Sequence, residues 1–149
     1  MKNSKGFTLL ELVVTIVLVG ILVGTAIPTF NKVVLSTQLQ INLSNMEIIK
    51  NTFMMYYQEG HMGGNPQFPT LPENNLLDSE YKDLVLPDGR TPDNLFSGKD
   101  GLPYNSNGNP YNYYQENDTS STGLVTRRIT IKDMDEDSPS YEEYVIGEI

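Results

Sequence analysis

The stretch that decides the fold of this chain is Lys5-Gly6-Phe7-Thr8-Leu9-Leu10-Glu11-Leu12. It opens an apolar segment that extends to Phe30, in which Glu11 is the only charged side chain. Taken as helix at ~1.5 Å per residue, residues 7–27 are roughly 31 Å long, which matches the hydrocarbon core of a bilayer. Lys2 and Lys5 precede the segment, so we expect the N-terminus in the cytoplasm and the rest of the chain outside. A carboxylate at mid-membrane costs on the order of 3 kcal/mol, so Glu11 calls for a functional explanation.

The string Gly6-Phe7-Thr8-Leu9-Leu10-Glu11 resembles the leader junction of type IV pilins, of type II secretion pseudopilins and of competence pseudopilins. The resemblance implies that a membrane aspartyl peptidase cuts between Gly6 and Phe7 and then methylates the new amine of Phe7. Glu11 becomes the fifth mature residue (11 − 6 = 5), where the family has a glutamate that pairs with the terminal amine of a neighbouring subunit. Pro28 becomes the twenty-second (28 − 6 = 22), where the family has a helix-bending proline.

Elementary electrostatics agrees with that role for Glu11. Cleavage before Phe7 creates a cationic amine beside the membrane, and a buried carboxylate is tolerated when it is paired. A partner from another chain would satisfy both charges and fix the stagger between two helices. We therefore interpret Glu11 as the residue that sets the axial register between neighbouring helices during assembly.

Two simpler interpretations of the N-terminal segment remain open. Gly24-Thr25-Ala26 has the form of a small-x-small cleavage site, as in a secretory signal peptide, but the apolar core is too long and carries Glu11 near its start. A plain membrane anchor explains the length of the segment. It explains neither the Gly6–Glu11 string nor Pro28.

Length and composition set the domain count. With 149 residues, we expect four parts: a leader at 1–6, a transmembrane and assembly half-helix at 7–30, an amphipathic half-helix at 31–58 and an acidic head at 59–149. The chain has no cysteine, which excludes a disulfide-stapled head and a thiolate metal site. Many type IV pilins close a C-terminal loop with a disulfide, so another interaction must hold that loop here.

The charge of the chain is strongly negative. Its net charge is −9, and from Glu59 onward 17 acidic residues stand against 6 basic ones. Such a head has no basic stripe to neutralise phosphates, so we expect no nucleic acid as a partner. We interpret the acidic surface as a source of solubility rather than as a cation-binding surface.

One long helix is expected from near Phe7 to near Gln58. Its outer half has apolar residues at helical spacing, namely Leu35, Leu39, Met46, Ile49, Phe53 and Tyr56. The intervening residues should form a soluble face: Asn31, Lys32, Gln38, Gln40, Asn42, Glu47, Lys50 and Asn51. A kink or local melting is predicted at Pro28. Close contact between helices is possible at Gly20 and Gly24. The C-cap is predicted at Gly60 and Gly63-Gly64.

The head is expected to be α+β with a pilin-like fold. A proline-rich loop region should contain one short helix near 78–86. Strands are predicted at 102–105 and 111–114, joined through the Asn107-Gly108 turn, and again at 124–132 and 141–149. Three or four antiparallel strands would then pack against the amphipathic half of the long helix.

Candidate sites in the head are few. Asp133, Asp135 and Asp137 alternate in the predicted turn between the last two strands, and alternating carboxylates can point at one cation. Major secretion pseudopilins hold calcium in a C-terminal loop, so the resemblance adds to this calcium hypothesis; a solvated acidic turn is the alternative. His61 is the only histidine, in a predicted glycine-rich loop without a nucleophile, and indicates no catalytic site. Tyrosines 104, 111, 113 and 114 should pack within the sheet rather than form a binding surface.

These observations predict a filament subunit that is not an enzyme and requires no cofactor. The resemblance implies a homopolymer, a prepilin peptidase and methyltransferase, an assembly ATPase, a platform membrane protein and minor pilins or pseudopilins. It places the chain in the bacterial inner membrane, single-pass with its head outside, and then in a periplasmic or surface filament. The segments 57–69 and 101–114 are similar to parts of secretion pseudopilins and favour that branch. A type IV pilin, a membrane-anchored binding module and a secreted enzyme remain as alternatives.

Overall fold

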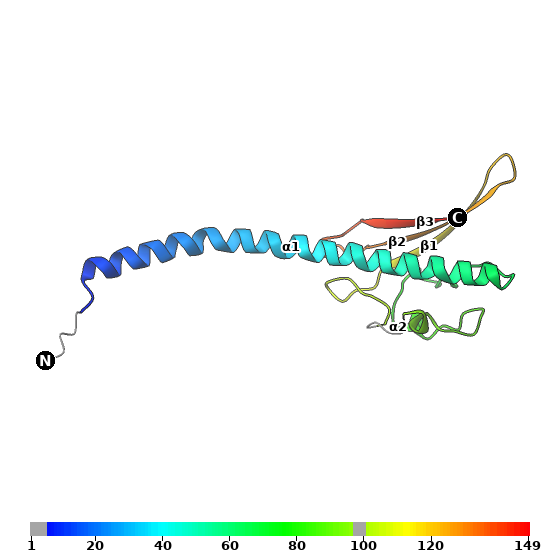
Figure 1. Ribbon diagram of the computed structural model, residues 1–149, viewed down its shortest axis with the longest axis horizontal. Coiled ribbons are helices and arrows are strands. Elements are labelled where there is room, and N and C mark those ends of the chain that lie inside the picture. The colour runs from blue at the N-terminus through cyan, green and yellow to red at the C-terminus, as the bar shows by residue number, and fades with distance from the viewer. Residues whose placement is uncertain (1–5, 97–100) are drawn as a thin grey trace. The chain divides into compact units, whose positions relative to one another are not determined.

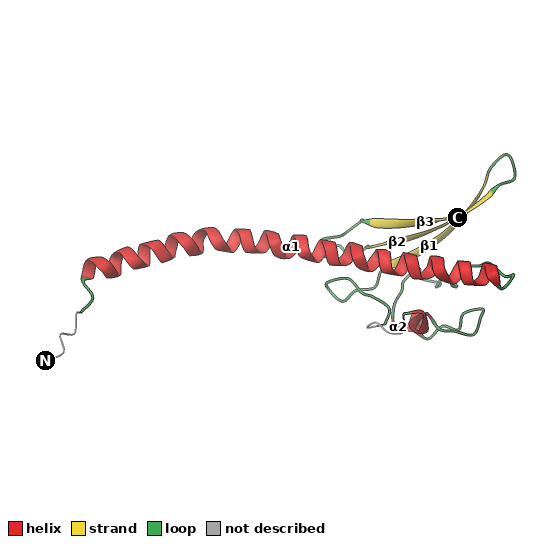
Figure 2. Cartoon of the chain, viewed as in Figure 1, coloured by secondary structure: helices red, strands yellow, loops and turns green. Residues whose placement is uncertain are grey.

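The computed structural model describes residues 6–96 and 101–149, so the expected leader lies outside the described residues except for Gly6. Helix α1 spans Leu9–Met62, and the short helices α2 and α3 span Ser79–Lys82 and Pro92–Leu95. Strands β1, β2 and β3 span Asn112–Thr119, Val125–Lys132 and Tyr144–Glu148 (Figures 1 and 2). This order, one long N-terminal helix and then a small antiparallel sheet, confirms the α+β, pilin-like class. The residue contacts divide the chain into residues 1–37 and residues 38–149.

In residues 6–37, α1 exposes nearly all of its apolar side chains. Every residue described from Gly6 to Thr37 is exposed, and the segment is long enough and apolar enough to cross a membrane. Of the kink or local melting predicted at Pro28, local melting is not found, because the helix continues through Pro28 without a break. Threonine hydroxyls are satisfied by the helix itself: Thr25 Oγ1 donates to the Ile21 carbonyl at 3.2 Å. This is how a hydroxyl is accommodated in a membrane.

In residues 38–149, one face of α1 forms the core of the head. Met46, Ile49 and Phe53 are fully buried, as their spacing predicts. The prediction fails at two positions that precede them. Leu35 is 55% exposed because the head first buries α1 at Asn42. Asn42, which was expected on the soluble face, is fully buried because polar groups of the head surround it.

The end of α1 lies about one turn beyond the expected position near Gln58. The helix includes Gly60 and His61, which was expected in a loop, and ends at Met62. Gly64 then adopts a φ of 82°, which glycine accepts without strain and which reverses the chain. The returning backbone passes so close that a Cβ at Gly60 would lie 2.8 Å from the Asn65 carbonyl oxygen.

The sheet has the order β1-β2-β3 with both pairs antiparallel. Pairing of Tyr113 with Ile131 puts both side chains on the inner face, where they are fully buried. The expected strand at 102–105 is not a strand, because its partner segment instead extends outward as β1 and pairs with β2. The Asn107-Gly108 turn therefore belongs to a loop rather than to a hairpin.

The core is aromatic and joins α1 to both sides of the head. The ring of Phe53 makes edge contacts with Tyr113 at 4.9 Å, Phe96 at 6.2 Å and Tyr81 at 6.5 Å between centroids. Tyr81 belongs to α2, at the position of the short helix expected near 78–86. Packing of Tyr111 and Tyr113 in the core, with no exposed surface, confirms the structural interpretation of these tyrosines.

Candidate functional site

The predicted cleavage point lies in a short non-helical segment. Gly6 and Phe7 are exposed, Phe7 with 78% of its surface accessible, and α1 begins only at Leu9. A Cβ added to Gly6 would meet nothing within 4 Å. The bond between Gly6 and Phe7 is thus free of helical structure and open to an enzyme.

Glu11 is held by the first turn of its own helix. The backbone N–H of Thr8 donates to Glu11 Oε2 at 2.9 Å, and the Thr8 hydroxyl donates to the same oxygen at 2.8 Å. In return, the Glu11 N–H donates to Thr8 Oγ1 at 3.3 Å. This reciprocal pattern is a capping box, with Thr8 as the N-cap and Glu11 three residues later. The signal for this role of Thr8 is present in the sequence as the spacing Thr8-x-x-Glu11, which the interpretation of Glu11 as an assembly residue leaves out.

Pro28, the other residue predicted to act in assembly, and the glycines at 20 and 24 lie farther along the same helix. Pro28 lacks an N–H, which leaves the Gly24 carbonyl without its usual helical donor. A Cβ added at Gly20 or at Gly24 would have no atom within 4 Å, so both glycines lie at open surface of the helix. None of the side chains in the most apolar part of α1 is buried. The N-terminal segment thus offers a continuous apolar surface with one carboxylate near its start.

The three aspartates of the calcium hypothesis lie in the turn between β2 and β3, but they differ in environment. Asp133 is fully buried, and its oxygens accept hydrogen bonds from Ser138 Oγ and Ser140 Oγ, both at 2.6 Å. Asp135 Oδ2 accepts from the side-chain amides of Asn105, Asn107 and Asn109 at 2.9 to 3.0 Å. Asp137 is exposed, and its backbone N–H donates to Asp135 Oδ1 at 3.2 Å.

These hydrogen bonds stabilise the charged form of Asp135. The amides of Asn109 and Asn107 contribute most, and together with Asn105 they outweigh burial and lower the pKa of Asp135 to about 2. The asparagine side chains turn their amide N–H groups, not their oxygens, toward Asp133 and Asp135, whereas a calcium ion needs oxygen ligands. Within residues 6–96 and 101–149, no group of three or more acidic, histidine or cysteine side chains is arranged to hold a metal. Calcium binding by these aspartates stays a prediction that the geometry does not favour.

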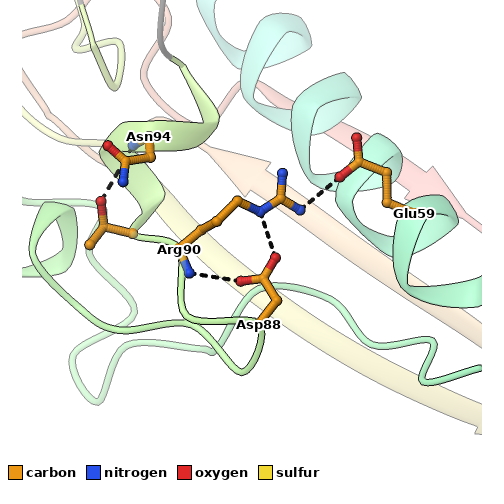
Figure 3. A network of polar contacts seen from close by, with 5 residues as sticks. Glu59, Asp88, Arg90 and Asn94 are labelled. Atoms are coloured by element: carbon orange, nitrogen blue, oxygen red, sulfur yellow. Dashed lines mark hydrogen bonds and ion pairs between the residues drawn. The ribbon is translucent and has the colours of Figure 1, made fainter. Parts of the chain in front are cut away.

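A second polar cluster joins the end of α1 to the loop before α3 (Figure 3). The Arg90 guanidinium pairs with Glu59 at 2.7 Å and with Asp88 at 2.5 Å, and it lies over the Tyr56 ring at 5.1 Å. Burial raises the pKa of Asp88, but hydrogen bonds and charge from Arg90 outweigh it and lower the pKa below its usual value. Arg90 thus pairs with both carboxylates of this cluster. The cluster therefore fastens a loop to α1 and leaves no cation available for a ligand.

Comparisons with known proteins agree with the N-terminal geometry. Residues 1–27 match the family model of the prokaryotic N-terminal methylation motif. No curated protein and no solved structure matches the chain. The match covers the cleavage point, the capping box and most of the apolar segment. Residues 1–27 of this chain are a prepilin-type methylation signal, the N-terminal signal of the type IV pilins and pseudopilins.

Proposed function

We propose that the chain is a structural subunit of a type IV filament, and specifically a major pseudopilin of a type II-like secretion system. The observation that carries this proposal is the methylation motif at residues 1–27, placed on an exposed apolar helix with Glu11 in its first turn. The motif is that of structural subunits rather than of enzymes. Catalysis of its own has no part in the proposed role.

Processing would change the partners available to Glu11. Cleavage between Gly6 and Phe7 breaks one peptide bond by hydrolysis and converts the nitrogen of Phe7 into an amine, which a methyltransferase then methylates. Thr8 and its capping interactions remain in the mature chain. Before assembly, the carboxylate of Glu11 accepts from Thr8; in the filament, it also pairs with the Phe7 amine of a neighbouring subunit. The capping box thus gives the carboxylate hydrogen-bond donors while the subunit waits in the membrane.

Assembly would bury the apolar surface of residues 7–30 against other copies of the same helix. In a bilayer that surface faces lipid, and in a filament it faces neighbouring helices. Gly20 and Gly24 leave room for close approach. An assembly ATPase and a platform membrane protein would supply the work of extraction, and minor pilins or pseudopilins would start the filament. The subunit would begin in the bacterial inner membrane with its head outside and end in a periplasmic or surface filament.

Two observations support the pseudopilin branch over a surface pilin. The chain has no cysteine, so no disulfide closes its C-terminal turn. The segments 57–69 and 101–114 are similar to segments of secretion pseudopilins. A type IV pilin that forms surface fibres for adhesion, motility or DNA uptake is the second candidate, supported by the same N-terminal motif. A membrane-anchored binding module is the third candidate, and it would insert without polymerising.

The experiment that tests the proposal is electron microscopy of sheared surface material from native cells, combined with the intact mass of the subunit. A chain that starts at methylated Phe7, stays in the cell envelope and forms no surface fibres supports the pseudopilin. Long surface fibres of the same processed chain would make it a type IV pilin. An unprocessed chain that remains monomeric in the membrane would contradict both and favour the binding module.

A further inference from the structure

The turn between β2 and β3, residues 133–143, has to be held in place without a disulfide. We propose that five side chains lock this C-terminal turn to α1 by hydrogen bonds alone, without a metal ion. We call this cluster the asparagine clamp; its members are Asn42, Asn105, Asp133, Ser138 and Ser140. The proposal concerns the head and does not depend on the filament function.

Asp133 is the centre of the clamp. Its carboxylate is fully buried and has no Lys, Arg or His within ion-pair distance among the described residues. It accepts instead from Ser138 Oγ and Ser140 Oγ at 2.6 Å, from the Asp135 N–H at 3.1 Å and from Asn105 Nδ2 at 3.2 Å. Several donors on one carboxylate compensate for the loss of water, as burial of a charge requires.

Asn42 connects this centre to the long helix. Its Nδ2 lies 2.8 Å from Ser140 Oγ and 3.1 Å from Ser138 Oγ, and both hydroxyls in turn donate to Asp133. Its Oδ1 accepts from the Ser106 N–H at 2.8 Å. Asn42 is the first fully buried residue of α1, so the clamp holds the place where the head first covers the helix. One amide thereby joins segments that lie 64 to 98 residues apart in the chain.

The orientation of Asn105 is fixed by its own loop. Its Oδ1 accepts from the Asn107 N–H at 3.0 Å and from the Asn109 N–H at 2.9 Å. The amide nitrogen must therefore point the other way, where it donates to Asp133 and to Asp135. A cation between these two aspartates would face the positive end of that amide. The geometry of Asn105 thus favours a hydrogen-bonded clamp over a calcium site.

The backbone of the turn indicates why a clamp is needed. Glu142 has a φ of 65°, in the left-handed region that residues other than glycine rarely adopt. Its N–H donates to the Asp133 carbonyl at 2.8 Å, while the Asp133 N–H donates to the Glu143 carbonyl at 3.0 Å. Such a conformation persists when the surrounding structure enforces it. Here two backbone hydrogen bonds to Asp133 hold it, and the side chain of Asp133 is itself fixed by Ser138 and Ser140.

The test uses the full processed chain in detergent micelles, with thermal unfolding followed by the near-ultraviolet circular dichroism of tyrosine. All nine tyrosines lie between residues 56 and 144, so the signal reports on the head and not on the membrane half of α1. We expect the Tm of the wild type to be the same with excess EGTA and with excess calcium chloride. A Tm that rises with calcium and falls with EGTA would overturn the proposal in favour of a bound cation.

Two variants on α1 make a matched pair. Asn42→Leu leaves the two serine hydroxyls and the Ser106 N–H without their partner, so the Tm should fall by more than about 5 °C. Asn51→Leu makes the same chemical change at an exposed position of the same helix and should shift the Tm by less than about 2 °C. Equal Tm values for the two variants would show that the clamp does not hold the head.

A milder variant keeps the test decisive if Asn42→Leu does not fold. Ser140→Ala removes one hydroxyl from Asp133 and from Asn42, so the Tm should fall by a few degrees. A protease that cuts after glutamate should then cleave the exposed Glu142 and Glu143 faster than in the wild type. An unchanged Tm together with an unchanged cleavage rate would contradict the clamp.

Discussion

The carboxylate of Glu11 has one set of donors in its own chain and a second that the proposed cleavage would create. The first set is the backbone N–H and the hydroxyl of Thr8. The second is the amine of Phe7 from a neighbouring subunit. Because a capping interaction contributes about 1 kcal/mol and breaking a buried ion pair costs about 3–5 kcal/mol, the two roles differ enough to be separated by mutation.

Glu11→Ala should leave membrane insertion unchanged and abolish polymerisation, because the terminal amine of Phe7 then lacks its partner. Thr8→Val should still polymerise, since it removes only the capping hydroxyl, at a cost of about 1 kcal/mol in helix stability. Membrane fractionation and electron microscopy of the filaments would measure both effects. Normal filaments from Glu11→Ala would show that the pairing is not what drives assembly.

Asp135 makes the stability of the head depend on pH. Its folded pKa of about 2 lies below the unfolded value of about 3.9. The unfolded chain therefore binds the proton more readily, and the contribution of Asp135 to stability is complete above about pH 5 and is lost as the pH falls toward 2. Asp135→Asn should be less stable than the wild type at neutral pH, and urea unfolding should show this difference shrink through that range. A difference that does not change with pH would show that the three asparagines do not stabilise the charged form.

At the scale of the elements, the end of α1 offers a test in which propensity and structure disagree. Helix propensity alone predicts that Gly60→Ala stabilises a helix by about 1 kcal/mol. The structure predicts the opposite sign, because the new Cβ would lie 2.8 Å from the Asn65 backbone oxygen. Gly63→Ala is the control, since its Cβ would be 3.5 Å from the nearest atom. Urea unfolding should give a lower free energy of unfolding for Gly60→Ala than for Gly63→Ala, and the reverse order would refute the close approach.

The elements also show which parts of the structure the sequence could predict. Period and composition were sufficient for α1, for β2 and β3 and for the buried stripe at Met46, Ile49 and Phe53, because burial of apolar side chains dominates there. They were insufficient for Asn42, whose burial depends on hydroxyls that lie 96 and 98 residues away. The predicted hairpin through Asn107-Gly108 was wrong for a related reason. The turn is present, but the strand that follows it, β1, pairs with β2 and not with residues 102–105.

The candidate sites also divide into residues that could be predicted from the sequence and residues that could not. The methylation signal at residues 1–27 could be identified from the sequence because the motif is local and contiguous. The roles of Gly6, Phe7, Glu11 and Pro28 stay predictions, and Pro28 lies just beyond the matched residues. The capping role of Thr8 was also within reach, since it follows from a three-residue spacing. The asparagine clamp was not, because its members come from α1, from the loop at 105–109 and from the turn between β2 and β3. Acidic residues at alternating positions suggested calcium, while the donors that surround them come from other segments.

At the scale of the whole molecule, the chain combines an apolar segment, whose only charged side chain is Glu11, with a strongly acidic head. Removal of residues 1–6 takes away Lys2 and Lys5, so the side-chain charge changes from 10 − 19 = −9 to 8 − 19 = −11. Since Glu11 would be paired inside the proposed filament, most of this charge would lie on the heads. Like charges at that density keep particles apart in solution.

We therefore expect the proposed filaments to remain separate at neutral pH and low salt and to bundle as the pH falls toward the isoelectric point, which is about 4.4 for the full sequence and lower without Lys2 and Lys5. Raising the salt at neutral pH should promote the same bundling, because the screening length falls to about 10 Å at 0.1 M. Low-speed sedimentation and electron microscopy across pH and salt would measure it. A variant with Glu136→Gln, Glu142→Gln and Glu143→Gln, which removes three exposed charges, should bundle at a higher pH. Bundling that is insensitive to pH, to salt and to these substitutions would mean that surface charge does not control contacts between filaments.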